Sequence, residues 1–166
     1  MTLFLPTVTL NRVTELQPSL LKSLQVKAVL LDVDNTLALH GSQQPFQGTI
    51  EWSHSLQNKG FRLIILSNNI RRRVEPFAAQ FSLPFYSMAM KPFPAAYIRA
   101  AHKVGASHEN AVVVGDQIFT DILGANLAGM KSVLVTPQKT ENSLSFRIRR
   151  KLEEPIRKKI SRENKK

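Results

Sequence analysis

The sequence of 166 residues contains no cysteine and no long apolar run. Without cysteine there can be no disulfide and no thiolate metal site, and this composition suits a reducing compartment. No window approaches the roughly 20 apolar residues that a helix needs to cross a bilayer. Residues 1–10 are apolar but short, are interrupted by Pro6 and carry no preceding positive charge, so they do not resemble a signal peptide. We therefore expect a cytoplasmic protein without a transmembrane segment.

Acidic residues are also scarce, because 12 Asp and Glu stand against 23 Lys and Arg, which gives a net charge of +11. The last twenty residues, 147–166, hold ten Lys or Arg and three Glu, and so contribute +7 of that charge. Such an excess predicts an anionic partner: a phospholipid surface, a nucleic acid or a phosphorylated substrate. The alternative is a solubilising, partly disordered tail that binds nothing.

The length and the hydrophobic content of 43% fit one domain with its own core. We expect this domain to span residues 1–140 and a basic amphipathic tail to occupy residues 141–166. Short aliphatic runs alternate with helical patterns, which predicts βαβ units and an α/β fold whose mostly parallel sheet has helices on both faces. The predicted strands are 26–32, 61–66, 111–114 and 132–136, with a weaker one at 83–86, and the predicted helices are 50–58, 72–81, 94–104 and 120–128.

Polar side chains follow the ends of three predicted strands. In a parallel sheet, ligands bind beyond the carboxyl ends of the strands, so these side chains are expected to converge on one site. They are Asp32 and Asp34 after the first strand, Ser67 and Asn68 after the second, and Asp116 after the third, with Lys91 on the connection before the third helix.

Three motifs carry this pattern: Asp32-Val33-Asp34-Asn35-Thr36, Leu66-Ser67-Asn68-Asn69 and Gly115-Asp116-Gln117-Ile118-Phe119-Thr120-Asp121, with Lys91 as a fourth element. In this order they resemble the haloacid dehalogenase (HAD) superfamily of phosphatases, and within it they are most similar to the YqeG family of subfamily IIIA. That family includes relatives of the mitochondrial phosphatidylglycerophosphate phosphatase. The resemblance runs from about Phe4 through the basic tail. It implies a Rossmann-like HAD fold and a Mg²⁺-dependent phosphatase.

The resemblance further implies a phospho-aspartyl intermediate. Asp32 would be the nucleophile, because a carboxylate can attack phosphorus in line and form an acyl phosphate. Asp34 would protonate the leaving oxygen and then act as the base on the water that hydrolyses the intermediate. This second role requires a carboxyl group that keeps its proton near neutral pH.

The family pattern also implies a Mg²⁺ site made by Asp32, Asp116 and the backbone carbonyl of Asp34. Carboxylate and carbonyl oxygens are the hard ligands that Mg²⁺ prefers. Asp121 would lie behind these ligands and hold a metal-bound water or Lys91. Alternatively, Asp121 only stabilises the N-terminal turn of its own helix.

Ser67, Asn68 and Lys91 are the residues expected to bind the phosphate. The Ser67 hydroxyl group and nearby backbone amides would donate hydrogen bonds to the phosphate oxygens. Lys91 would neutralise charge on the phosphate and on the acyl phosphate. Taken alone, Ser67 could be a helix N-cap and Lys91 an ordinary surface lysine. The histidines show no metal-ligand spacing, so we interpret them as surface or partly buried residues. They are His40, His54, His102 and His108.

No cap domain is expected over this site. HAD caps enter after the first motif or between the second motif and the lysine, but here residues 37–48 form only a short loop and residues 67–91 hold one helix and a short strand. An open site cannot easily enclose a small metabolite, but it can accept a phosphate that projects from a large surface. The candidate surfaces are a membrane, a nucleic-acid end or a phosphoprotein.

The basic tail carries an apolar residue at every fourth position, at Leu144, Ile148, Leu152, Ile156 and Ile160. Interleaved with Arg and Lys, this stripe is typical of a helix that lies on an anionic membrane. The proline at position 155 is expected to break or kink the helix. The alternative is that the stripe packs on the domain as a final helix.

Three functions follow from these patterns. The first is a phosphatase that converts phosphatidylglycerophosphate to phosphatidylglycerol, located peripherally on the inner face of a membrane. The second is a phosphatase on nucleic-acid ends, nucleotides or another phosphorylated substrate, since a chain of charge +11 could hold a nucleic-acid backbone. It is less favoured because no nucleic-acid-binding module is recognisable and no aromatic residues are interleaved with the basic tail. The third is a non-catalytic binding module.

Overall fold

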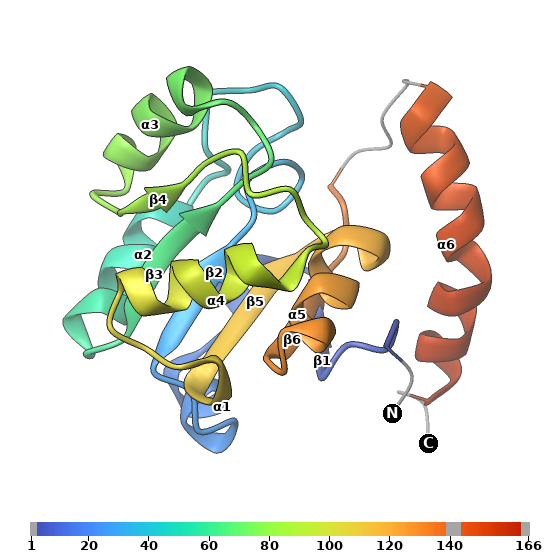
Figure 1. Cartoon of the computed structure of the whole chain (residues 1–166), viewed down its shortest axis with the longest axis horizontal. Coiled ribbons are helices and arrows are strands. Elements are labelled where there is room, and N and C mark those ends of the chain that lie inside the picture. The colour runs from blue at the N-terminus through green and yellow to red at the C-terminus, as the bar shows by residue number, and fades with distance from the viewer. Residues whose placement is uncertain (1–2, 139–143, 164–166) are drawn as a thin grey trace.

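The computed structural model describes residues 3–138 and 144–163. In this part of the chain six strands form one sheet, in the order β1-β6-β5-β2-β3-β4, and every neighbouring pair is parallel (Figure 1). The strands are β1 Val8–Leu10, β2 Ala28–Leu31, β3 Arg62–Leu66, β4 Phe85–Tyr86, β5 Ala111–Gly115 and β6 Lys131–Val135. The predicted α/β fold with a parallel sheet is confirmed.

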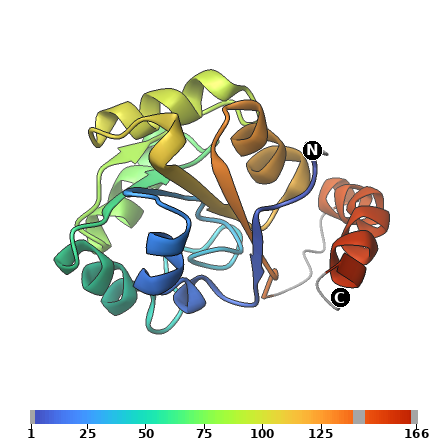
Figure 2. The same cartoon turned by 90° about the horizontal axis from the view of Figure 1, so that it is seen from below.

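Helices cover both faces of this sheet, as Figure 2 shows. Helices α1, α2 and α3 contribute to the core on one face, and α4 and α5 to the core on the other. Their bounds are α1 Pro18–Ser23, α2 Thr49–Asn58, α3 Arg71–Gln80, α4 Pro94–Lys103 and α5 Leu123–Leu127, and a sixth helix, α6, spans Leu144–Glu163. Short 3-10 turns lie at Val13–Glu15 and His108–Asn110, and a π-helical turn at Ile118–Ile122 precedes α5.

The central strand β2 explains why the sheet was recognisable in the sequence. Val29 and Leu31 are buried in one core, whereas Ala28 and Leu30 are buried in the other. A strand that is buried on both faces must be apolar at every position, so it appears in the sequence as a continuous aliphatic run.

Two elements near the N-terminus were not predicted. Strand β1 has only three residues and pairs with β6 at the edge of the sheet, with Val8 opposite Val133. Helix α1 begins at Pro18 and has six residues. Both are too short for a periodic pattern to be distinguished from a loop. The helix predicted over 120–128 is present, but its first turn is the π-helical segment 118–122.

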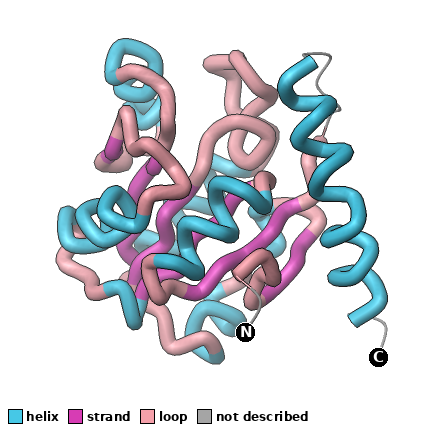
Figure 3. The backbone as a smooth tube through the Cα atoms, turned by 45° about the vertical axis from the view of Figure 1, so that its right-hand side comes forward, coloured by secondary structure: helices cyan, strands magenta, loops and turns pink. Residues whose placement is uncertain are grey.

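Helix α6 lies outside the β1 edge of the sheet (Figures 1 and 3). The break predicted at Pro155 is wrong, because α6 is continuous from Leu144 to Glu163. Pro155 and Lys151 are both exposed, so the carbonyl of Lys151, which loses its usual amide partner, can face water instead. The domain boundary predicted after residue 140 lies outside the described residues.

The predicted apolar stripe of α6 divides between two environments. Ile160 is buried with Ile118, Ile122 and Leu134, and Ile156 is partly buried against the same group. Ile148 and Leu152 are exposed on the N-terminal half of the helix, and the side chain of Leu144 lies outside the described residues. The tail therefore packs on the domain through one part of its stripe and presents the other part to solvent.

Candidate active site

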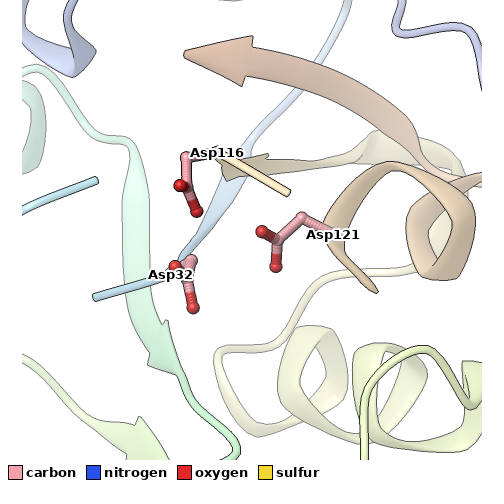
Figure 4. Close-up of side chains that lie close together, drawn as sticks. All are labelled: Asp32, Asp116 and Asp121. Atoms are coloured by element: carbon pink, nitrogen blue, oxygen red, sulfur yellow. The ribbon is translucent and has the colours of Figure 1, made fainter. Parts of the chain in front are cut away.

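Three carboxylates, one after β2 and two after β5, point toward one another, as Figure 4 shows. They belong to Asp32, Asp116 and Asp121, which are all buried, and oxygen atoms from each lie within 4.8 Å of one another. Strands β2 and β5 are neighbours in register, with Leu31 opposite Val114, so the residues that follow them leave the sheet side by side. The amide of Asp32 also donates to the carbonyl of Val114 at 2.9 Å, which fixes this approach.

Gly115 makes room for the third carboxylate. A Cβ atom at position 115 would lie 2.2 Å from Cγ of Asp121, which is too close for any other residue to be accommodated without a shift. Asp121 is carried on the π-helical turn, and its Oδ2 accepts a hydrogen bond from the amide of Gln117 at 3.1 Å. π-Helical turns are frequent at functional sites because they redirect a side chain without ending the helix.

Replacing Gly115 by Ala is therefore expected to displace Asp121 from the carboxylate cluster. We expect the overpacking to cost about 1–3 kcal/mol of folding free energy. We also expect the Mg²⁺ concentration for half-maximal phosphatase activity to rise. Thermal unfolding and a Mg²⁺ titration of phosphate release measure the two effects. A variant with an unchanged Mg²⁺ requirement would contradict this account of Gly115.

Lys91 joins two of the three carboxylates. Its Nζ lies 2.5 Å from Oδ1 of Asp32 and 2.7 Å from Oδ1 of Asp121, and the side chain is buried. Burial alone disfavours the ammonium group, but the carboxylates of Asp121 and Asp32 raise the pKa of Lys91 above its ordinary value. Burial raises the pKa of Asp32 above its ordinary value, and the positive charge of Lys91 partly offsets this increase. Of the two contacts expected for Asp121, the structure contains the one with Lys91.

Asn68 connects the two loops that carry the site. Its side-chain oxygen accepts a hydrogen bond from the amide of Lys91 at 2.7 Å, and its side-chain nitrogen donates to the Lys91 carbonyl at 3.4 Å. Ser67 is buried beside it, where its Oγ accepts from the amide of Asn69 at 3.1 Å and its carbonyl accepts from the amide of Ala89 at 3.1 Å. Asn68 thus positions Lys91, a contact that spacing along the chain does not reveal.

Asp34 also lines the pocket of the site, and several donors surround its carboxylate. Oδ2 accepts from the side chain of Asn69 at 2.9 Å, and Oδ1 accepts from Arg73 at 3.1 Å and from the amide of Gly41 at 3.0 Å. Nδ1 of His40 lies 3.5 Å from Oδ1. Sequence reasoning assigned no role to Asn69, Arg73 or His40. Arg73 carries no distinguishing signal there, because it is one of three consecutive arginines that open α3.

These residues enclose a pocket of about 150 Å³ that opens to solvent. A phosphate group fits within this volume, and because the pocket opens to solvent a larger substrate can extend beyond it. The residues that line it are Asp32, Asp34, His40, Ser67, Asn68, Asn69, Lys91, Gln117 and Thr120. The connections 37–48 and 67–91 add no separate domain above this pocket in the described part of the chain.

Helix α6 contacts the loop that carries Asp116. The buried carboxylate of Glu153 accepts from the amide of Ile118 at 2.7 Å, and Arg157 donates to the carbonyl of Asp116 at 2.6 Å and to Glu153 at 3.0 Å. Sequence reasoning missed both residues, because a Glu and an Arg four positions apart are typical of a solvated helix surface. The packed side of α6 therefore holds the backbone of Asp116 and Ile118 in place beside the site.

The donor set fits a hard divalent cation. Three buried carboxylates that approach one another this closely repel each other unless positive charge lies between them, and Lys91 supplies such charge to Asp32 and Asp121. Oxygen ligands of this kind suit Mg²⁺. Asp32 and Asp116 would hold the ion, and Asp121 is close enough to contribute.

Comparison with known proteins matches most of the chain to phosphatases. A family model described as HAD-hydrolase-like matches residues 88–153, and one described as mitochondrial PGP phosphatase matches residues 1–80. The chain is 34% identical over 153 residues to a protein of Bacillus subtilis (strain 168) named "Probable phosphatase YqeG", covering 92% of this chain and 89% of that protein.

More distant relatives share only part of their length with this chain. The "Glyceraldehyde 3-phosphate phosphatase" of Methanothermobacter thermautotrophicus is 31% identical over 107 residues, which cover 59% of this chain and 47% of that protein. Among solved structures, NagD from E. coli K-12 aligns with a TM-score of 0.59 at 16% identity, covering 70% of this chain and 90% of that one. This last likeness concerns the fold. In the described residues, no helix is both long and apolar enough to span a bilayer.

Proposed function

Because the chain belongs to the YqeG family of HAD phosphatases, we propose that it hydrolyses phosphomonoesters through a phospho-aspartyl intermediate on Asp32, with Mg²⁺ as cofactor and phosphatidylglycerophosphate as substrate. The observation that carries the mechanism is the convergence of Asp32, Asp116 and Asp121 around Lys91 at the carboxyl edge of the sheet.

In the first half of the reaction an Asp32 oxygen attacks phosphorus, so that an O–P bond forms to the carboxylate and the P–O bond to the alcohol breaks. Asp34 gives its proton to the departing alkoxide. In the second half Asp34 takes a proton from water, the water oxygen attacks phosphorus, and the Asp32 carboxylate is released. Asp34 lines the same pocket as Asp32, so its carboxyl group is within the site where the alcohol leaves and the water attacks.

Charge neutralisation comes from residues around the phosphate. The Lys91 ammonium group already lies between Asp32 and Asp121, so it is in place to stabilise the negative charge that gathers on the transferring group. Ser67 and Asn68 line the same pocket and offer hydroxyl and amide donors. A Mg²⁺ ion held by Asp32, Asp116 and the Asp34 carbonyl would screen the nucleophile from the phosphate charge.

Three observations support a lipid substrate. The first 80 residues match the family model of the mitochondrial PGP phosphatase. The pocket has room for a phosphate group and opens to solvent, so the rest of a large substrate can lie outside it. Helix α6 exposes Ile148 and Leu152 together with Lys151 and Lys158, a combination that suits an anionic bilayer. We accordingly propose that the protein works peripherally on the inner face of a membrane, in contact with the cytoplasm.

A vesicle assay tests the substrate. Phosphate release from phosphatidylglycerophosphate in phosphatidylglycerol vesicles is compared with release from a soluble aryl phosphate and from a phosphorylated oligonucleotide, each with Mg²⁺. We expect the lipid to have the highest kcat/KM, because only it combines the phosphate with an anionic surface. Good turnover of the aryl ester without release from the lipid would reject the lipid substrate. A preference for the oligonucleotide would instead favour phosphatase activity on nucleic-acid ends.

A further inference from the structure

Four large apolar side chains are exposed on the two segments that carry Asn69 and Lys91, which line the pocket. Ile70, Met88, Met90 and Phe93 have exposed fractions of 59%, 64%, 68% and 62%. We refer to these four residues as the apolar rim. Single exposed apolar residues are common on proteins, but a group of four beside one pocket marks an interaction surface.

The apolar rim is attached directly to residues of the site. Ile70 follows Asn69, and Met90 precedes Lys91. The amide of Met88 donates to the carbonyl of Asn69 at 2.9 Å, so the two segments that carry the rim are hydrogen-bonded to each other. Figure 1 shows the segment between β4 and α4 running along the same end of the molecule as the start of α3. The rim is therefore held in place by the same contacts that hold the phosphate pocket.

The backbone of the rim has an energetically unfavourable conformation. Met88 and Met90 have φ angles of +51° and +53°, in the left-handed region, whereas Ala89 between them is buried. This conformation is unfavourable for a residue with a Cβ atom, because the Cβ approaches the following carbonyl oxygen. Here it turns both methionine side chains outward into solvent. Strain that places apolar groups in water gains nothing within the folded monomer, and such strain is often stored at sites of function.

Positive charge lies next to the rim. Arg71 and Arg72 directly follow Ile70 and are exposed; Arg71 is paired with Glu75 at 2.7 Å, whereas Arg73 pairs with Asp34 in the pocket at 3.1 Å. The N-terminal half of α6, which exposes Ile148 and Leu152, starts at the same end of the molecule (Figures 1 and 3). Apolar side chains surrounded by arginines complement an anionic bilayer, whose headgroup phosphates lie just above an apolar layer.

We propose that the apolar rim enters the interfacial layer of an anionic phospholipid bilayer, with Arg72 against the headgroup phosphates. The pocket then opens onto the headgroups, and a phosphate monoester on a lipid reaches Asp32 without leaving the bilayer. This surface rests on the lipid substrate of the proposed function and specifies how that substrate is presented.

The test measures binding of the full chain to vesicles without substrate. The variant Met88→Gln/Met90→Gln/Phe93→Gln removes apolar groups that take no part in the pocket, and Gln is as tolerant as Met of the backbone at positions 88 and 90. Its matched control is Leu3→Gln/Leu127→Gln, which removes exposed apolar groups outside the rim. Co-sedimentation is measured with vesicles of pure phosphatidylcholine and of phosphatidylcholine with phosphatidylglycerol.

We expect the wild-type protein and the control to bind the vesicles that contain phosphatidylglycerol, and the rim variant to bind them at least about 10-fold more weakly, because each apolar side chain loses its transfer free energy. Turnover of a soluble aryl phosphate should stay within about twofold of wild type, since the rim does not touch the phosphate pocket. Equal binding by the rim variant and wild type, or no binding by wild type, would overturn the proposal. Normal vesicle binding with no hydrolysis of phosphatidylglycerophosphate would instead reject the substrate and leave the rim intact.

Discussion

Replacing Asp32 by Asn is expected to lower phosphate release from any phosphomonoester by about 10⁴-fold or more, as the loss of a nucleophile does in other covalent mechanisms. The amide has nearly the same shape as the carboxylate but cannot attack phosphorus to form the acyl phosphate. The measurement is release of phosphate from a soluble aryl phosphate at saturating Mg²⁺. The same loss should appear with phosphatidylglycerophosphate in vesicles, because both substrates pass through the same intermediate.

The fold should survive this substitution. Burial raises the pKa of Asp32, so the position tolerates a neutral side chain, and Lys91 keeps its contact with Asp121. The melting temperature is therefore expected to stay within a few degrees of wild type.

The matched control is Asp121→Asn, which makes the same chemical change in the same cluster but spares the proposed nucleophile. Its loss of activity should be smaller and should be reduced by a higher Mg²⁺ concentration, whereas Mg²⁺ should not rescue Asp32→Asn. Activity of the Asp32 variant above about 1% of wild type would contradict the phospho-aspartyl mechanism. A wild-type protein without turnover of any phosphoester would instead indicate a non-catalytic binding module.

The parts of the site that sequence reasoning located share one property. Asp32, Ser67 and Asp116 each follow a buried strand, and the in-register pairing of β2 with β3 and β5 brings them to one edge. These strands are apolar throughout except for Arg62 at the start of β3, so their carboxyl ends are well defined along the chain. The rule that parallel sheets bind ligands at their carboxyl edge then supplies the proximity.

The parts that were missed depend on packing between elements far apart in the sequence. Glu153 and Arg157 have the spacing of a solvated ion pair, and only the seating of α6 on the domain brings them to Ile118 and Asp116. In the sequence, Asn69 could equally be a turn residue. Its hydrogen bond to Asp34 forms because the segment after β3 lies next to the segment after β2. Spacing along one chain carries no information on such contacts.

Replacing Lys91 by Met is expected to have the second large effect. It would leave the buried carboxylates of Asp32 and Asp121 without their shared cation, and removing one partner of a buried pair typically costs about 3–5 kcal/mol of folding free energy. Phosphate release should also fall, by about 10²–10³-fold, as when a single donor to a developing anion is removed. Urea unfolding at pH 7 and phosphate release at saturating Mg²⁺ measure the two losses. Lys59→Met, a change at an exposed lysine, is the control and should alter stability by less than about 0.5 kcal/mol.

The stability of the Lys91→Met variant is also expected to depend on pH in a definite direction. In the wild type Lys91 lowers the pKa of Asp32, against the larger effect of burial. Its removal therefore raises the pKa of Asp32 further above the unfolded value, and the folded variant binds a proton that the unfolded chain releases. Stability of the variant should then decline relative to wild type as the pH rises from about 5 to 8, because the unfolded aspartate has a pKa of about 3.9. Mg²⁺ should recover more stability in the variant than in wild type, since the carboxylate cluster has lost the one cation that shielded Asp32 from Asp121. A stability difference that is independent of both pH and Mg²⁺ would show that Lys91 acts by packing, not by charge.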